Sequence, residues 1–285
     1  MKECFFTYEG KGLSVHHTRD DSPNGVDVVL HAHRSYELYY FISGAGRYTI
    51  EGNEYPLESG CLLVMRDGEA HTAHLHGQDT PYERICINFA PESMPLLENE
   101  IRELYRNRPL GKGNHFKPDQ RSAAFIEACM ERLCEDVESE GYEEHARTIL
   151  GMLLLELYKL REHTPSQEEN SPERTVVELR GSAETVRRII SYINENLTAI
   201  KNSDELAREF FFSKAYINRI FKQATGSSVW DYVVLKRLLL ARSMLREGKQ
   251  ACIVASECGF CDYSSFYRQY RRRFGTSPQT ARKKR

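Results

Sequence analysis

The 285-residue sequence lacks the features that mark secreted and membrane proteins. Its first residues, MKECFFTYEGKG, contain no apolar run of the kind found in a secretory signal. No stretch approaches the ~20 consecutive apolar residues that span a bilayer. The eight cysteines follow no disulfide framework, and the Cys258-x-x-Cys261 motif has no second pair to complete a zinc site. These absences predict a cytoplasmic protein with reduced thiols and no membrane partner.

The sequence also has little net charge, but the two kinds of charge are separated along it. The whole chain has 39 Lys plus Arg and 41 Asp plus Glu. Residues 181–285 carry 20 basic and 9 acidic side chains, whereas residues 1–180 carry 19 basic and 32 acidic ones. A cationic C-terminal part predicts a polyanionic partner for that part alone. Nucleic acid is the commonest such partner, and an anionic surface is the alternative.

Short runs of β-branched and aromatic residues, separated by turn signals, predict β structure over residues 1–90. The predicted strands are 26–30, 37–42, 47–50, 61–64 and 82–87. Many short strands at regular spacing favour a sandwich or barrel. A helical period then predicts helices over 122–137 and 142–161. The apolar stripe of the helix 142–161 predicts a homodimer through this helix, with packing onto the barrel of the same chain as the alternative.

The segment 162–178 is polar, punctuated by proline and without periodicity, which is typical of a linker between domains. It divides the chain into three predicted parts. These are a β-rich domain with two helices over 1–163, a linker over 164–180 and a cationic helical domain over 181–285.

One helix-turn-helix pattern is present twice in the last third of the chain. In the first copy Ser203 and Ser213 are predicted to cap two short helices, and in the second copy Asp262 has this role. The second helix of each copy has an apolar face and an outward face suited to DNA. The predicted DNA-contacting residues are Lys214, Ala215, Asn218, Arg219 and Lys222 in the first copy, and Ser264, Tyr267, Arg268, Arg271 and Arg272 in the second.

The second copy contains Gly259-Phe260-x-Asp262-x-Ser264-x-Phe266-x-Arg268-x-Tyr270-Arg271, followed by Phe274-Gly275-x-Ser277-Pro278. With the first copy, this resembles the AraC/XylS family of bacterial transcription regulators over roughly residues 185–282. Tyr270 stands where the family usually has Phe, and Ala281-Arg282 where it has Tyr-Arg. The resemblance implies two helix-turn-helix motifs, joined by a helix over 229–246, that bind adjacent major grooves of double-stranded DNA.

The N-terminal part contains His31-x-His33-x3-Glu37 and, further on, His71. This spacing resembles the cupin pattern, although Arg66 and Leu75 stand where Pro and Asn are usual. If residues 31–33 form a strand, alternation places both histidines on one face. Imidazoles and a carboxylate suit a divalent transition metal such as zinc, iron, nickel or manganese. In the alternative interpretation, these residues line an effector site together with Tyr39 and Arg47.

The expected fold is α+β: a cupin-like β-barrel, two helices, and an all-α domain with two helix-turn-helix motifs. The expected function is that of a sequence-specific transcription regulator, not an enzyme. A small effector, for which the family's habits suggest a carbohydrate, controls it from the barrel. The resemblance implies activation as the output and RNA polymerase as a partner. A cupin metalloenzyme or metal sensor fused to a DNA-binding module is the alternative, and a structural protein that binds polyanions without sequence preference is a third hypothesis.

Overall fold

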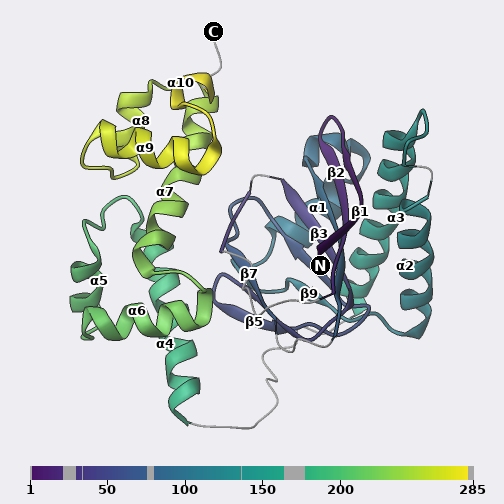
Figure 1. The fold of residues 1–285 in the computed structure, drawn as a ribbon, viewed down its shortest axis with the longest axis horizontal. Coiled ribbons are helices and arrows are strands. Elements are labelled where there is room, and N and C mark those ends of the chain that lie inside the picture. Colours follow the sequence, from purple (N-terminus) through teal and green to yellow (C-terminus); the bar gives the residue numbers. More distant parts are fainter. Residues whose placement is uncertain are drawn as a thin grey trace. The chain divides into compact units, whose positions relative to one another are not determined.

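The computed structural model describes residues 2–21, 30–33, 35–75, 80–135, 137–163 and 177–281. The chain divides into two compact units (Figure 1). The N-terminal unit holds residues 1–28 and 33–174, and the C-terminal unit holds residues 29–32 and 175–285. Most of the predicted strand 26–30 and of the predicted linker 164–180 lies outside the described residues. Within the described residues, no helix has the length and apolar character needed to cross a membrane.

Two antiparallel sheets form the N-terminal unit. The larger sheet contains, in spatial order, β1 (Lys2–Glu9), β2 (Leu13–Asp20), β8 (Tyr82–Phe89), β3 (Tyr36–Ser43), β6 (Leu62–Met65) and β9 (His115–Phe116). The smaller sheet contains β5 (Asn53–Pro56), β4 (Gly46–Ile50) and β7 (His71–Leu75). Four predicted strands are present as β3, β4, β6 and β8. Strands β1, β2, β5, β7 and β9 were not predicted.

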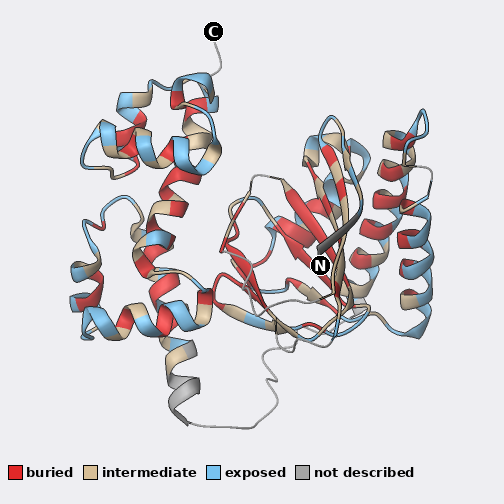
Figure 2. Cartoon of the chain, in the orientation of Figure 1, coloured by how far each residue is buried: buried red, intermediate tan, exposed pale blue. Residues whose placement is uncertain are grey.

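Strands β3 and β6 of the larger sheet are buried on both faces, and they are among the red strands of Figure 2. The inner face of this sheet packs against the smaller sheet through a cluster that includes Tyr39, Phe41 and Tyr82 from one sheet and Tyr48 and Ile50 from the other. Its outer face packs against helices through a second cluster, because side chains alternate along each strand. The covering elements are η1 (Pro91–Ser93), η2 (Pro95–Leu97), α1 (Glu98–Ile101), the π-turn η3 (Arg102–Arg106), α2 (Gln120–Leu133) and α3 (Tyr142–His163).

The apolar stripe of α3 is buried within the N-terminal unit itself. Ile149, Leu150, Leu153, Leu154 and Leu157 are each at most 5% exposed and belong to the cluster on the outer face of the larger sheet. The stripe that suggested a homodimer therefore packs within its own chain, as the alternative interpretation expected. The helix predicted over 122–137 is also shorter than expected, since α2 ends at Leu133.

The C-terminal unit is helical. It contains α4 (Val177–Asn196), α5 (Ser203–Glu209), α6 (Lys214–Thr225), α7 (Val229–Arg246), α8 (Ala251–Glu257), α9 (Tyr263–Phe274) and α10 (Pro278–Ala281). Ser213 and Asp262 cap α6 and α9 as predicted, each accepting a hydrogen bond from a backbone N–H of the first turn. The predicted cap of α5 was wrong by one residue, because the Asn202 side chain accepts that hydrogen bond and Ser203 is already helical.

Helix α7 packs against both helix-turn-helix motifs. In the first motif, Phe221 of α6 is fully buried and its ring lies 5.5 Å from that of Tyr232 on α7. In the second, Phe266 and Tyr270 of α9 are fully buried in a cluster with Leu238 of α7. The two motifs, α5–α6 and α8–α9, are thus attached to one continuous helix of 18 residues.

Candidate nucleic-acid interface and effector site

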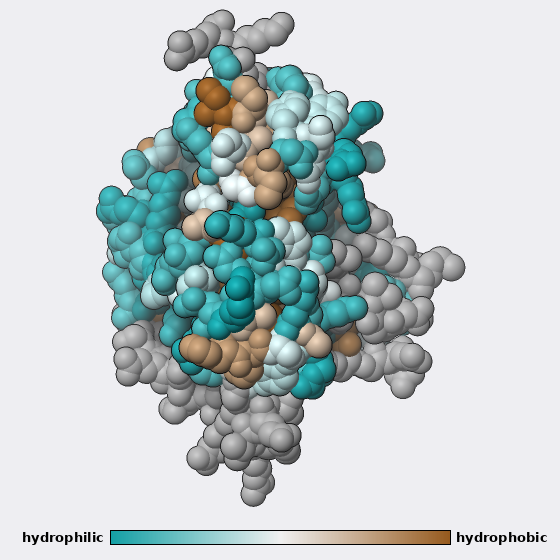
Figure 3. Space-filling view, turned by 90° about the vertical axis from the view of Figure 1, so that its left-hand side faces the viewer, coloured by the Kyte–Doolittle hydropathy of each residue, from teal (hydrophilic) through white to brown (hydrophobic). Residues whose placement is uncertain are grey.

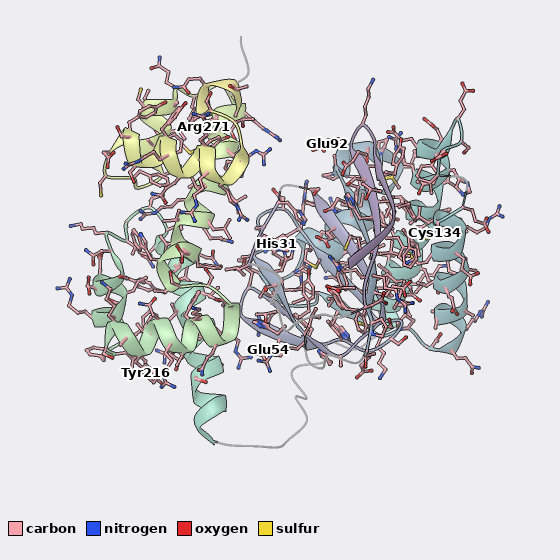
Figure 4. All side chains as sticks on the ribbon, viewed as in Figure 1. His31, Glu54, Glu92, Cys134, Tyr216 and Arg271 are labelled. Atoms are coloured by element: carbon pink, nitrogen blue, oxygen red, sulfur yellow. The ribbon has the colours of Figure 1, made fainter. Side chains whose placement is uncertain are left out.

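The outward face of α6 carries the side chains predicted to contact DNA. Lys214, Ala215, Arg219 and Lys222 are all exposed, while Ile217 on the opposite face is 1% exposed. The Arg219 guanidinium lies 5.3 Å from the centre of the Tyr216 ring, which restricts the arginine without neutralising it. Figure 4 labels Tyr216 on this helix. The face is therefore cationic and accessible, with a small residue at its N-terminal end.

Lys214 and Asn218, two of the predicted contacts of α6, already have partners within the protein. Lys214 Nζ donates to a carboxylate oxygen of Asp204 at 3.0 Å. Asn218 makes two hydrogen bonds. Its Nδ2 donates to the carbonyl of Lys214 at 3.1 Å, and its Oδ1 accepts from the backbone N–H of Val229 at 3.4 Å. Val229 is the first residue of α7, so Asn218 joins the two helices. A base contact by Asn218 would have to replace these bonds.

The outward face of α9 is more strongly basic. Ser264, Arg268, Arg271 and Arg272 are exposed, and Tyr267 is half-buried. The helix has three basic residues in its last turn and no acidic residue, so none of its arginines has an acidic neighbour on the same helix. Figure 4 labels Arg271 on this face. Side chains of this kind bind phosphate oxygens and base edges.

Hydrophilic side chains dominate the face of the molecule shown in Figure 3, with a few hydrophobic spots among them. The large hydrophobic residues exposed in the C-terminal unit are Phe211, Phe212, Leu240 and Ile253. Phe211 is the extreme case, with 94% of its surface exposed. It lies in the turn between α5 and α6, and the sequence analysis did not single it out.

In the N-terminal unit His33, Glu37 and His71 come together. His33 Nε2 lies 2.5 Å from Glu37 Oε2, and His71 Nε2 lies 3.6 Å from the same oxygen. One ring nitrogen from each of His31, His33 and His71 lies within 4.8 Å of the others, a spacing that fits three ligands of one cation. Figure 4 labels His31. The predicted strand for the two histidines is wrong: His31 makes an isolated bridge, and residues 32 and 33 have no regular structure.

Glu37 controls the protonation of His33. Burial by itself lowers the pKa of His33, but the hydrogen bond and the charge of Glu37 outweigh this effect and raise that pKa above its usual value of 6.5. Tyr48 stacks on His71 at 5.9 Å between ring centres, and the Tyr39 and Tyr82 hydroxyls lie 2.6 Å apart. Tyr39 is therefore close to the group, with its hydroxyl already in a hydrogen bond.

Arg47 is the predicted effector residue that the structure does not bring to this group. It alternates with the inward-facing Tyr48 on β4, so its side chain lies on the opposite face of the smaller sheet. There its Nε lies 3.3 Å from Glu54 Oε1, and both side chains are about 40% exposed. The arginine that does lie on the inner face is Arg84 of β8, which the sequence analysis missed.

The N-terminal unit has polar side chains that point inward, and the C-terminal unit has two cationic recognition helices. Together they define a DNA-binding transcription regulator that binds a ligand. Comparison with protein families agrees with this assignment. An AraC-like ligand binding domain matches residues 20–155, and a helix-turn-helix domain matches residues 206–284. The chain belongs to the AraC/XylS family of transcription regulators.

Curated relatives and solved structures match all or part of this chain. The HTH-type transcriptional activator RhaS of Escherichia coli O81 (strain ED1a) is 24% identical, over 95% of this chain and 97% of that protein. The structure of ToxT from Vibrio cholerae has a TM-score of 0.41 and 12% identity, over 95% of this chain and 97% of ToxT. The C-terminal domain of the response regulator yesN from Fusobacterium nucleatum has a TM-score of 0.33 and 22% identity, over 35% of this chain and 99% of that domain.

Proposed function

We propose that this protein activates transcription when a small effector binds inside its N-terminal unit. The main support is that two exposed cationic recognition helices are carried by one continuous helix, α7. Activation is the function named for the relative RhaS. On this proposal the protein is a regulator rather than an enzyme. It acts in the cytoplasm, where the chromosome lies, and RNA polymerase is its partner in activation.

The proposed domains are 1–163 for effector binding and dimerisation, 164–180 as a linker and 181–285 for DNA binding. The proposed contacts on α6 are Lys214, Ala215, Arg219 and Lys222, with Asn218 in a supporting position. Those on α9 are Ser264, Tyr267, Arg268, Arg271 and Arg272. One helical turn of DNA is ~10 base pairs, so two recognition helices on one face cover about two turns.

The proposed homodimer uses a different face of α3 from the one that the sequence suggested. Met152 and Leu155 on α3 are each 41% exposed, and Phe125 on α2 is 37% exposed. The two helices lie antiparallel, because Ser122 near the start of α2 donates to Glu156 on α3 at 2.8 Å. Phe125 lies one turn after Ser122, and Met152 lies one turn before Glu156, which supports the proposal that the three exposed residues form one apolar patch.

The effector site is proposed to include His31, His33, Glu37, His71 and Tyr39. Buried imidazoles and a carboxylate beside tyrosine rings suit a polyhydroxylated ligand such as a carbohydrate derivative. Control requires that the effector binds one arrangement of the protein better than another, since a ligand with equal affinity for both shifts nothing.

The close approach of three histidine nitrogens favours a second candidate, a metal-sensing regulator. The residues fit such a cation: His31, His33 and His71 would hold it, with Glu37 as a further ligand or as the hydrogen-bond partner that orients His33. Elemental analysis of the purified full-length protein decides between the two. One equivalent of zinc, iron, nickel or manganese that is lost in a His71→Ala variant supports the metal sensor. A metal-free protein that responds to an organic effector excludes it.

The experiment that tests the proposed function is a gel-shift assay with the DNA upstream of the protein's own gene, at stated salt and with nonspecific competitor DNA. We expect specific binding that an Arg219→Ala, Arg268→Ala double variant loses. Arg132→Ala is the matched control, because this arginine is 67% exposed on α2, outside the proposed interface. Equal loss of affinity for specific and competitor DNA would instead indicate a polyanion-binding protein without sequence preference.

A further inference from the structure

Arg84 lies on the inner face of the larger sheet, among buried aromatic residues. In the register of β8 it pairs with Phe41 of β3, which is 1% exposed, and with Thr18 of β2. Tyr82, two residues earlier on the same face, is 3% exposed. The Arg84 guanidinium sits 4.9 Å from the centre of the Tyr82 ring. A charged side chain thus lies half-buried in the region between the two sheets.

Among the described residues, Arg84 has no carboxylate within ion-pair distance and no oxygen that accepts a hydrogen bond from it. Its contacts are the Tyr82 ring and the Cys86 thiol. Two other buried arginines of the chain are fully engaged. Arg108 binds both carboxylate oxygens of Glu69 at 2.7 Å, and Arg237 donates to three backbone carbonyls. Arg84 is half-buried and, among the described residues, has no anionic partner, although charges removed from water in proteins are normally paired.

A second unsatisfied group stands beside it. The Thr18 hydroxyl oxygen is buried and has no hydrogen-bond partner within the described part of the chain. Thr18 and Arg84 are directly opposite each other on neighbouring strands, and such pairs have their Cβ atoms about 5 Å apart on the same face. A donor hydroxyl and a guanidinium side by side form a site for a carboxylate, which accepts hydrogen bonds through both oxygens.

Within the described ranges of the chain, no side chain supplies the missing negative charge. Burial raises the pKa of the Cys86 thiol to about 12 and that of Tyr82 to about 12, so both neighbours of Arg84 are neutral at physiological pH. Glu37 is ionisable, but it is engaged with His33 at 2.5 Å and pairs in register with Asn88. Asn88 is four residues from Arg84 along β8, so their Cα atoms are about 13 Å apart. The Cys86 side chain between them contacts both the Arg84 and the Glu37 side chains.

We propose that the effector carries a carboxylate that Arg84 and Thr18 bind, and hydroxyl groups that face the end with His33 and Glu37. A hexuronate, which is a hexose with its C6 oxidised to a carboxylate, has this chemistry. A neutral sugar would leave Arg84 without an anion. This inference rests on the proposed function and names the chemical class of its effector.

The test compares two hexuronates, galacturonate and glucuronate, with their neutral parents, galactose and glucose. Thermal unfolding of the full-length protein is followed with each compound at constant ionic strength, set with sodium chloride. We expect the unfolding temperature to rise with a uronate and to stay unchanged with the neutral hexoses, because a ligand that binds only the folded state stabilises it. Calorimetric titration then gives the affinity.

Arg84→Met is expected to weaken uronate binding by about 10- to 100-fold, since it removes charge-assisted hydrogen bonds. Arg84→Lys should keep part of the affinity, and Thr18→Val should lose less than Arg84→Met while keeping the arginine in place. Arg47→Met is the matched control, because that arginine faces away from the site. Uronate binding by Arg84→Met as strong as that of the unaltered protein overturns the proposal, even if the unfolding temperature of the variant itself changes.

Equal stabilisation by galactose and galacturonate overturns the inference, as does a panel in which neither uronate binds. The gel-shift assay separates these outcomes from a failure of the proposed function. If a neutral hexose binds and changes the affinity for upstream DNA, the protein is an effector-controlled regulator and only the carboxylate is wrong. If uronates bind but DNA affinity does not respond, the carboxylate site stands and the control of DNA binding by it fails.

Discussion

Arg237 Nη1 donates a hydrogen bond to the carbonyl oxygen of Gly259 at 2.6 Å, which joins helix α7 to the turn of the second helix-turn-helix. The same guanidinium donates from Nε to the carbonyl of Leu197 at 2.9 Å and from Nη2 to that of Ile200. Both carbonyls lie between α4 and α5, at the entry to the first helix-turn-helix. One side chain, only 2% exposed, thus holds the two motifs in a single arrangement.

Replacing Arg237 should loosen the spacing of the two recognition helices on DNA. In the unaltered protein, we expect affinity to fall sharply when two base pairs are inserted between the two major-groove sites, because a rigid pair cannot follow the rotated site. Arg237→Met should bind the original site more weakly and show a smaller penalty for the insertion. Gel shifts with the two DNA lengths measure this.

Arg242→Met serves as the control. Arg242 lies on the same helix as Arg237, and its guanidinium contacts the Phe274 ring. A purely structural role of Arg237 would lower the affinity for both DNA lengths by the same factor, which would contradict the spacing function. Circular dichroism of each variant confirms that the helices are retained.

The two turns differ at one equivalent position. Phe211 and Gly259 both have left-handed backbones, with φ of 57° and 81°. A non-glycine residue in this conformation costs roughly 1 kcal/mol. Phe211→Gly should therefore stabilise the protein by about 1 kcal/mol, measured by thermal or urea unfolding. An unchanged or lower stability would show that the Phe211 ring makes a stabilising contact that offsets the strain.

Gly259→Ala is the opposite change and should be destabilising. Its new Cβ would lie 2.6 Å from the Thr198 carbonyl oxygen and 2.9 Å from the Arg237 guanidinium, in addition to the strain of the left-handed backbone. We expect a loss of about 1–3 kcal/mol. A loss of stability below about 1 kcal/mol would contradict this prediction. If the Gly259→Ala protein also kept the unaltered response to DNA spacing, the turn would be able to move away from Thr198 and Arg237 without cost.

The sequence predicted the C-terminal unit more completely than the N-terminal unit because its signals are local. Helical periodicity, capping side chains such as Ser213 and Asp262, and a basic outward face all lie within a dozen residues of one another. Strands β1, β2 and β7 were missed because their inner faces carry polar residues such as His16 and Thr18, so their alternation does not look like that of a half-buried strand.

The missed site residues depend on contacts between distant segments. Arg84 meets Thr18 only through the pairing of β8 with β2, and no spacing along the chain indicates this. Arg237 looks like one more basic residue on a helix until its three carbonyl partners are known. The burial of α3 likewise depends on the whole sheet, which is why the helix's apolar stripe suggested a partner subunit.

Each recognition helix is expected to lose sequence-specific binding when one of its arginines is removed. Arg219→Ala and Arg268→Ala should each lose about 1–3 kcal/mol of binding at a restricted set of base positions, as expected for bidentate contacts to base edges. The measurement is binding to a library of upstream sites with single base changes. If either variant weakens binding to every sequence equally, that arginine contacts phosphate instead, and the salt dependence of binding should decrease with it.

The exposed patch on α2 and α3 should hold two copies of the protein together. Leu155→Glu places a charge in the centre of this patch, where it would be buried against the partner, and so we expect the dimer to dissociate. Sedimentation equilibrium measures the oligomeric state directly. Ile253→Glu makes a similar change at a residue that is 47% exposed in the C-terminal unit, and it should leave the dimer intact. A Leu155→Glu protein that remains dimeric would move the interface away from α3.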